Sequence, residues 1–195
     1  MVDLGKKIYI IKLYFIRIIS TFFMKLKLKI FNISFQNEIQ FYGQCYIYKI
    51  KESKISLGRK LTFRSYPNSN LIGINRNCAI STLTPDAKII IGDSCGFSGT
   101  VIGAFKSITI GENVRCGANT LITDSDWHLD DPRSGTPKPI VIENNVWLGE
   151  GVKVLKGVTI GENSVIGAGS VVTKNIPANV IAGGNPCKVI KEINI

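Results

Sequence analysis

Histidine and paired cysteines are scarce in this chain of 195 residues, and their scarcity excludes several kinds of site. The chain has one histidine, His128, and five cysteines that form no CxxC pair. A zinc site of the usual kind needs three or four His, Cys or carboxylate ligands, so we expect no metal. The odd cysteine count also argues against a disulfide framework. Reduced thiols, with Cys116 as a small buried hydrophobe, favour a cytoplasmic protein.

Long uninterrupted apolar runs are scarce as well. Lys12, Arg17 and Lys25 interrupt the apolar start of the chain, which leaves no span of the ~20 residues that a transmembrane helix needs. No small-residue cleavage site follows it, so we expect no signal peptide. We predict a helix over Leu4–Phe23 and, because lysines alternate with aliphatic residues, a strand over Lys25–Ile30. Together they form an N-terminal appendage, residues 1–38.

Acidic residues are few in the first part of the chain. Residues 1–60 hold 12 Lys and Arg against 3 Asp and Glu, whereas the remainder holds 12 against 11. Two interpretations of this basic segment stay open: a compositional bias, or a peripheral contact of residues 1–30 with an anionic membrane, which would place the protein at the inner face of that membrane. No nucleic-acid-binding motif accompanies the charge, so we expect no nucleic-acid partner.

Six consecutive groups of six residues, here called hexads, fill residues 142–177. The first position of each hexad is aliphatic: Ile142, Leu148, Val154, Ile160, Ile166 and Val172. The fifth position is small or β-branched, and glycine often takes the second. A period of six fits neither a helix nor an alternating strand. It is typical of a parallel β-helix, in which short strands alternate with tight corners and equivalent side chains stack from coil to coil.

The same first position can be followed backwards to about Ile39, although the spacing is less regular. Three hexads make one coil of eighteen residues, and the steps from Leu57 to Ile74 to Ile91 are seventeen residues each. The step from Ile110 to Ile142 is thirty-two residues. We therefore predict that a loop, Thr123–Pro139, interrupts one coil of a β-helical domain that covers residues 39–195. A long loop on a repeat scaffold is a frequent place for function.

An ordered series of motifs in the second half resembles the hexapeptide-repeat acyltransferases. The series is Asn145-Val-Trp-Leu-Gly149, Gly157-Val-Thr-Ile-Gly161, Ile166-Gly-Ala-Gly-Ser-Val-Val-Thr-Lys174 and Gly183-Gly-Asn-Pro-Cys-Lys188. It is most similar to the branch of galactoside, maltose and polysaccharide O-acetyltransferases. The resemblance implies an all-β fold, a left-handed parallel β-helix. It also implies a homotrimer with sites between subunits and acetyl-coenzyme A as co-substrate.

The resemblance implies a catalytic role for His128. The family places its catalytic histidine at the root of such a loop, usually in a Gly-His-Pro triplet, where this chain has Trp127-His128-Leu129. A histidine can take the proton of a sugar hydroxyl near neutral pH. Asp126 either orients this histidine or forms an Asx turn. Asp124, Asp130 and Asp131 are expected to be solvated loop charges.

The resemblance also implies which residues hold the coenzyme. Backbone around Gly149 and Ala168 would meet the pantetheine arm, and Thr173 and Lys174 would lie along it. Lys188 and Lys191 would neutralise phosphate, where the family often has arginine; lysine does this without the bidentate fork. Trp147 either forms a wall of the site or is a packing residue.

We predict an acetyl-coenzyme A-dependent O-acetyltransferase that modifies a carbohydrate, in capsule or lipopolysaccharide synthesis. The acceptor pocket departs from the galactoside enzymes, because Ile91-Gly-Asp93 is followed by Ser94–Gly99 without their acceptor-binding asparagine. Two alternatives stay open: an N-acetyltransferase of an amino-sugar nucleotide and an acetyltransferase that modifies an antibiotic. A binding or structural β-helix without activity is a third, and coenzyme binding would separate it from the enzymes.

Overall fold

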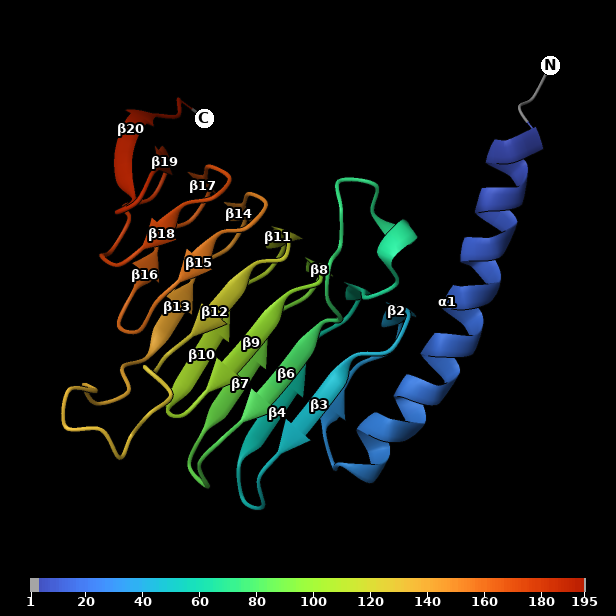
Figure 1. The fold of residues 1–195 in the computed structure, drawn as a ribbon, viewed down its shortest axis with the longest axis horizontal. Helices are drawn as coiled ribbons and strands as arrows, with labels where there is room; N and C mark the ends of the chain where they lie inside the picture. The colour runs from blue at the N-terminus through green and yellow to red at the C-terminus, as the bar shows by residue number, and fades with distance from the viewer. Residues whose placement is uncertain (1–3, 195) are drawn as a thin grey trace.

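The computed structural model describes residues 4–194 and shows one long helix followed by a left-handed parallel β-helix (Figure 1). The helix is α1 (Leu4–Ile30). A short 3₁₀ turn, η1 (Pro67–Ser69), lies in the second coil. Three parallel sheets form the faces of the β-helix, and successive strands of the chain visit them in turn. The predicted fold is therefore confirmed.

The first sheet holds β1 (Ser34–Phe35), β4 (Lys54–Leu57), β7 (Lys88–Ile91), β10 (Ser107–Ile110), β13 (Ile140–Ile142) and β16 (Thr159–Ile160). The second holds β2 (Gln40–Tyr42), β5 (Thr62–Arg64), β8 (Gly96–Ser98), β11 (Arg115–Ala118), β14 (Trp147–Leu148), β17 (Val165–Ile166), β19 (Val180–Gly183) and β20 (Lys188–Glu192). The third holds β3 (Tyr46–Lys49), β6 (Ala79–Thr82), β9 (Val101–Ala104), β12 (Leu121–Thr123), β15 (Lys153–Val154) and β18 (Val171–Val172). Strand β20 runs antiparallel to β19 and ends the second sheet.

The hexad pattern makes the core as predicted. First-position residues pair in register from coil to coil, as Ile110 does with Ile142 and Ile142 with Ile160. All six first-position side chains of residues 142–177 are fully buried, and the fifth-position side chains are buried with them. Near the N-terminal end, Phe41, Phe63 and Phe97 stack with ring centroids 5.1 and 4.9 Å apart. Burial of such apolar side chains stabilises the coil stack.

From β10 onward, the corners between the first and second sheets are built by asparagine. Asn113, Asn145, Asn163 and Asn179 have φ values of 55, 58, 59 and 58°, a left-handed conformation that asparagine tolerates better than most residues. Their side-chain amides donate to one another in a ladder, at 2.9, 3.0 and 2.8 Å. Each corner therefore supports the corner of the next coil.

The N-terminal appendage differs from the prediction. The structure continues α1 through Lys25–Ile30, where a strand was predicted. Leucine and lysine are good helix formers, and Met24 and Leu28, one turn apart, are buried against the β-helix. The alternation with period two is therefore incidental. Stacked strands begin at Ser34, ahead of Ile39, because β1 pairs with β4. Residues 1–3 of the predicted appendage lie outside the described residues.

The second coil also differs from the prediction. Leu57 pairs directly with Ile91 and Ile47 with Ile80, so the two predicted steps of seventeen residues are one coil. Residues 65–78 form a second loop, between β5 and β6, and Ile74 lies in it rather than in a strand. The predicted interruption at Thr123–Pro139 is confirmed, since β12 ends at Thr123 and β13 begins at Ile140.

Within the described part of the chain, no helix is long and apolar enough to cross a bilayer.

Candidate active site

The root of the loop that carries His128 is fixed by buried polar contacts. Asp124 is fully buried, and its two carboxylate oxygens accept hydrogen bonds from the backbone N–H groups of Phe105 and Lys106, both at 2.7 Å. Burial raises the pKa of the Asp124 carboxyl, and these N–H groups act against that rise. The prediction of a solvated Asp124 is wrong, because this carboxylate closes the turn of the preceding coil.

Trp127 holds the residue next to His128 in an unusual conformation. Its φ is 71°, which is rare for a bulky side chain. The indole N–H donates to Thr123 Oγ1 at 2.8 Å, and the ring meets Phe105 edge to face, with centroids 5.5 Å apart. The tryptophan ring also covers Gly103, where a Cβ would come within 2.7 Å of it. These contacts set the direction in which the chain leaves the coil at His128.

His128 itself is exposed on this fixed root. Its carbonyl accepts a hydrogen bond from the N–H of Asp131 at 3.1 Å, which closes a turn over Leu129 and Asp130. Arg133 pairs with the Asp131 carboxylate and lowers its pKa. The histidine is thus accessible to a substrate, and several contacts within the loop stabilise the segment that carries it.

Asp126 does not orient His128 in this structure. Its carboxylate pairs with Lys156 and accepts a hydrogen bond from the N–H of Gly135 at 3.0 Å. Lys156 and then this N–H lower the pKa of Asp126. The carboxylate therefore ties the far side of the loop to the turn after β15.

Three of the predicted site residues meet at one hollow of about 480 Å³. Trp147, Gly149 and Ala168 line it, and the tryptophan is 53% exposed. The remaining lining residues are Asn70, Ile72, Gly117, Ala118, Glu150, Val165, Ile166 and Gly167. The sequence left open whether Trp147 packs or forms a wall, and the structure places it in the wall.

The floor of this hollow is backbone brought close by glycine. A Cβ on Gly149 would lie 2.6 Å from the backbone nitrogen of Ala168, so no larger residue fits there. The Gly149 N–H donates to Ile166 O at 2.8 Å. By contrast, the N–H groups of Glu150 and Ala168 have no hydrogen-bond partner within the described residues. They are the backbone donors that a ligand in the hollow could use.

The four other predicted coenzyme residues do not line the hollow. Thr173 and Lys174 are exposed in the corner after β18, and Lys188 and Lys191 are exposed on β20. All four belong to the last coils, as does Ala168. Figure 1 also shows that the His128 loop leaves one edge of the β-helix, whereas the turns after β14 and β17 lie along the opposite edge. One chain therefore does not bring His128 to the hollow.

The unpredicted second loop reaches the same hollow. Arg76 fixes it by donating to the carbonyl of Gly99, at 3.1 Å, and to that of Asn119. Asn70 then donates to Ser98 Oγ at 3.1 Å. Ser98 belongs to the segment in which the resemblance expects an acceptor-binding asparagine, and the side chain that contacts it here is Asn70 of the second loop. No hexad signal marks residues 65–78, although the glycine and asparagines of Asn68–Gly73 are typical of a loop.

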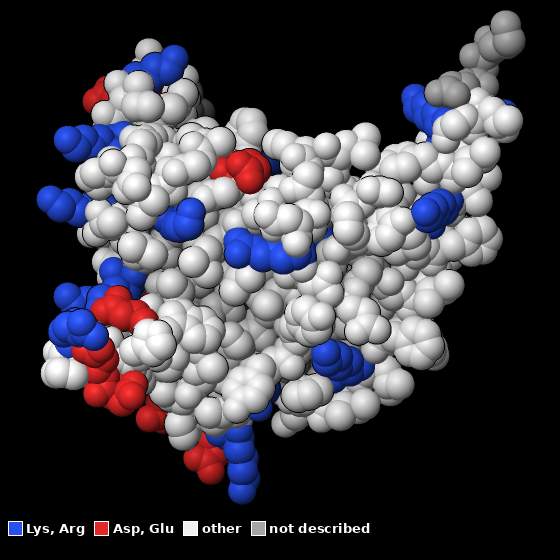
Figure 2. Space-filling view, viewed as in Figure 1, with Lys and Arg blue, Asp and Glu red and all other residues white. Residues whose placement is uncertain are grey.

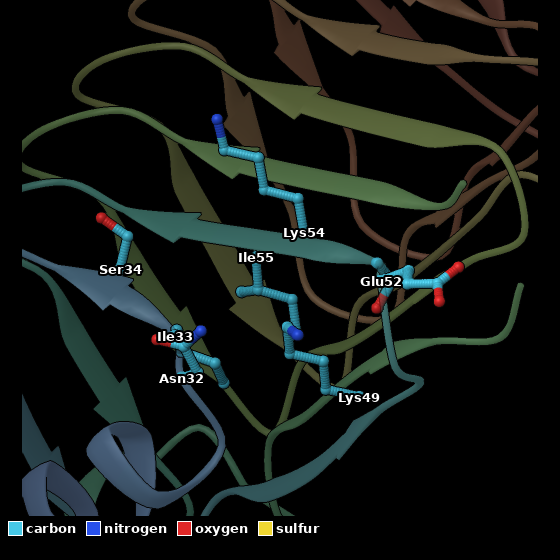
Figure 3. A pocket seen from close by; sticks show the side chains of 8 residues that line it. Asn32, Ile33, Ser34, Lys49, Glu52, Lys54 and Ile55 are labelled. Atoms are coloured by element: carbon cyan, nitrogen blue, oxygen red, sulfur yellow. The ribbon is translucent and has the colours of Figure 1, made fainter. Parts of the chain in front are cut away.

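A second hollow, of about 420 Å³, lies at the other end of the coil stack, where α1 leads into β1. Figure 3 shows Lys54 and Glu52 at this hollow with side chains that extend in different directions. None of the predicted site residues lines it. The hollow around Trp147 is the better candidate for a ligand site, because three of the predicted site residues line it.

Known proteins with similar sequences include several acetyltransferases. Residues 139–174 match the family model described as bacterial transferase hexapeptide, six repeats. The chain is 48% identical over 102 residues to galactoside O-acetyltransferase of Escherichia coli, and the aligned region covers 50% of each protein. It is 37% identical over 131 residues to a polysialic acid O-acetyltransferase of Escherichia coli, covering 62% of this chain and 43% of that protein. The chain thus spans about half the length of the curated relatives it matches.

Solved structures support the fold independently. The β-helix superimposes on AntD, an N-acyltransferase from Bacillus cereus solved with coenzyme A and a dTDP-amino sugar, with a TM-score of 0.68. The match covers 88% of this chain and 90% of AntD at 18% sequence identity. At that sequence identity, the structural similarity supports the fold alone.

Proposed function

We propose that the chain is an acetyl-coenzyme A-dependent O-acetyltransferase that modifies a carbohydrate hydroxyl, because residues 139–174 match the bacterial transferase hexapeptide model and the chain is similar to galactoside O-acetyltransferase. The observation that carries the proposal is the single histidine, which stands exposed on a loop whose root is held by Asp124 and Trp127. We assign the acceptor to surface polysaccharide, as in the polysialic acid relative. The reaction would take place in the cytoplasm. A lipid-linked acceptor would hold the enzyme at the inner face of the membrane.

The proposed reaction needs only one histidine. The imidazole of His128 takes the proton of the acceptor hydroxyl as its oxygen attacks the thioester carbonyl of acetyl-coenzyme A. The tetrahedral oxyanion accepts hydrogen bonds from backbone N–H groups, for which those of Glu150 and Ala168 are available. The C–S bond then breaks, and coenzyme A leaves as the thiol after taking the proton from the imidazolium. No acyl-enzyme forms, and no metal takes part.

The coenzyme would lie along the last coils. Its acyl end would enter the hollow beside Trp147, over the backbone of Gly149 and Ala168. Its phosphates would face the exposed lysines, Lys174, Lys188 and Lys191, and Thr173 would lie between these two regions. Ammonium groups attract phosphate as point charges. The lysines do not line the hollow, so one coenzyme A molecule would have to extend from the hollow to them.

A homotrimer would complete the site. His128 and the hollow lie on opposite edges of one chain, so a neighbouring subunit must supply one of them. In a cyclic trimer every interface pairs the same two unlike surfaces, and three equivalent sites result. The acceptor would enter at the side of the second loop, where Asn70 and Ile72 line the hollow.

The test is release of coenzyme A from acetyl-coenzyme A with a panel of sugars, nucleotide sugars, amino sugars and glycan fragments. The wild type should turn over a hydroxyl acceptor, and His128→Ala should lose roughly 10²-fold or more in kcat/KM because a general base contributes about that much. Asp130→Asn, which changes an exposed charge in the same loop, should retain activity. Acetylation of amines alone would replace the O-acetyltransferase with the amino-sugar alternative. Equal turnover by His128→Ala would refute the assignment of the base.

A further inference from the structure

One face of α1 is apolar and uncovered. Seven large apolar side chains follow one another at intervals of three and four residues along it, and Ile19 lies beside Ile18. The seven are Leu4, Ile8, Ile11, Phe15, Ile18, Phe22 and Leu26. This spacing places them on one side of the helix, and we call them the outer stripe. Their exposed fractions lie between 46 and 71%. A continuous apolar surface of this length usually marks a contact with another molecule.

The opposite face of α1 packs against the side of the β-helix. Met24 and Leu28 are buried there. Thr21 Oγ1 accepts a hydrogen bond from the N–H of Phe41 at 2.9 Å, and Ser20 Oγ accepts one from that of Gly43 at 3.1 Å. Nearer the N-terminus, the Tyr9 hydroxyl donates to Asn68 O at 2.7 Å. These contacts point the outer stripe away from the protein over the length of the helix.

The charge around the outer stripe has one sign. Residues Leu4–Ile30 contain seven Lys and Arg and no Asp or Glu. Lys7, Lys25 and Lys29 each follow a residue of the stripe by three positions and so lie beside it. Within the described residues, the ammonium groups of these three lysines have no hydrogen-bond or ion-pair partner. Figure 2 shows isolated basic patches over α1 and no acidic surface there on the face in view.

We propose that the outer stripe of α1 binds the surface of an anionic phospholipid bilayer. The apolar side chains would enter the boundary between headgroups and acyl chains, and the flanking lysines would reach the lipid phosphates. A second copy of α1 fits the stripe less well, because pairing two stripes would bring like-charged lysines together. The binding of lipid does not depend on the proposed acetyl transfer, so either can fail without the other.

The test is co-sedimentation of the full chain with vesicles of phosphatidylcholine, with and without phosphatidylglycerol. We expect binding to the anionic vesicles that weakens as salt rises. Phe15→Ser with Phe22→Ser should abolish most of it. Lys7→Gln, Lys25→Gln and Lys29→Gln together should weaken it about fivefold for each lysine, which is the effect of one basic residue near an anionic surface. The lysine variant leaves the buried face of α1 intact and so keeps the test independent of folding.

Matched controls lie on the β-helix. Ile90→Ser with Ile190→Ser removes two exposed apolar side chains, and Lys51→Gln, Lys54→Gln and Lys88→Gln remove three exposed lysines. Both control variants should bind as the wild type does. Absence of binding to the anionic vesicles, or equal binding to both kinds of vesicle, would overturn the proposal. A third outcome would also overturn it: the wild type binds no vesicle, and the phenylalanine variant loses an oligomeric state that the wild type has. The outer stripe would then join copies of this chain.

Discussion

At the scale of single residues, the loop beside His128 depends on the pair of Asp126 and Lys156. The ammonium of Lys156 lowers the pKa of Asp126. A carboxyl whose pKa is lowered by folding stabilises the folded loop above its unfolded value of about 4, and this stabilisation is lost as the pH falls through the lowered value. Because both side chains are partly exposed, the effect on global stability is small and is expected in the loop alone.

We therefore predict that Lys156→Met raises the pKa of Asp126 toward its ordinary value. The measurement is an NMR titration of the Asp126 carboxyl in both proteins. Lys138→Met, which removes a lysine of the His128 loop that does not pair with Asp126, should leave the titration where it is in the wild type. An unchanged Asp126 titration in Lys156→Met would mean that the pair does not persist in solution.

The residues that the sequence could and could not assign differ in how local their roles are. Burial of the hexad positions follows from the period alone, whereas the role of His128 rests on the family resemblance and stays a prediction. Asp124 was mistaken for a solvated charge because its partners, the N–H groups of Phe105 and Lys106, lie one coil back. The partner of Asp126 could not be predicted for the same reason, because Lys156 lies in the next coil. Pairs across coils are not visible in a pattern read along the chain.

At the scale of elements, the loop of residues 65–78 depends on Arg76. Its guanidinium bridges the carbonyls of Gly99 and Asn119, which belong to two successive corners. Asn119 in turn accepts a hydrogen bond from the N–H of Asn75 at 3.1 Å and donates to Gly73 O at 2.8 Å. This network holds Asn70 and Ile72 at the edge of the hollow.

We predict that Arg76→Ala removes the hydrogen-exchange protection of the Asn75 amide and costs about 1 kcal/mol of stability, because one charged donor is lost at a partly exposed site. Arg76→Lys should restore little, since an ammonium cannot span two carbonyls as the fork does. If acetyl transfer is established, both variants should raise the KM for the acceptor more than that for acetyl-coenzyme A. Wild-type protection of Asn75 in Arg76→Ala would contradict this account of the loop.

The same loop shows why the first half of the fold was harder to predict than the second. Ile74 is aliphatic, buried and seventeen residues from both Leu57 and Ile91, so it imitates a coil position. The true register pairs Leu57 with Ile91, and only contacts between coils reveal it. The strand predicted for Lys25–Ile30 was wrong for a similar reason. The alternating pattern does not show that Met24 and Leu28 are buried against the β-helix, and this contact favours the helix.

At the scale of the whole molecule, the separation of His128 from the hollow leads to a prediction about mixed oligomers. His128→Ala removes the proposed base but leaves the hollow as it is. Ala168→Phe fills the hollow, because Ala168 is exposed at its wall and no core side chain has to move. Each variant alone should be inactive, and only Ala168→Phe should lose binding of coenzyme A.

If neighbouring subunits share each site, a trimer that contains both variants has one interface at which an intact His128 meets an intact hollow. Random mixing of equal amounts makes three quarters of the trimers mixed, so the co-expressed variants should recover about a quarter of the wild-type activity. The measurement is turnover of the co-purified mixture against each variant alone, with the trimer mass checked by light scattering. A site within one chain could not be rebuilt by mixing, so inactivity of mixed trimers would place His128 and the hollow in separate functions. Recovery would show that the loop of one subunit reaches the Trp147 surface of the next, which explains why the single chain keeps them on opposite edges.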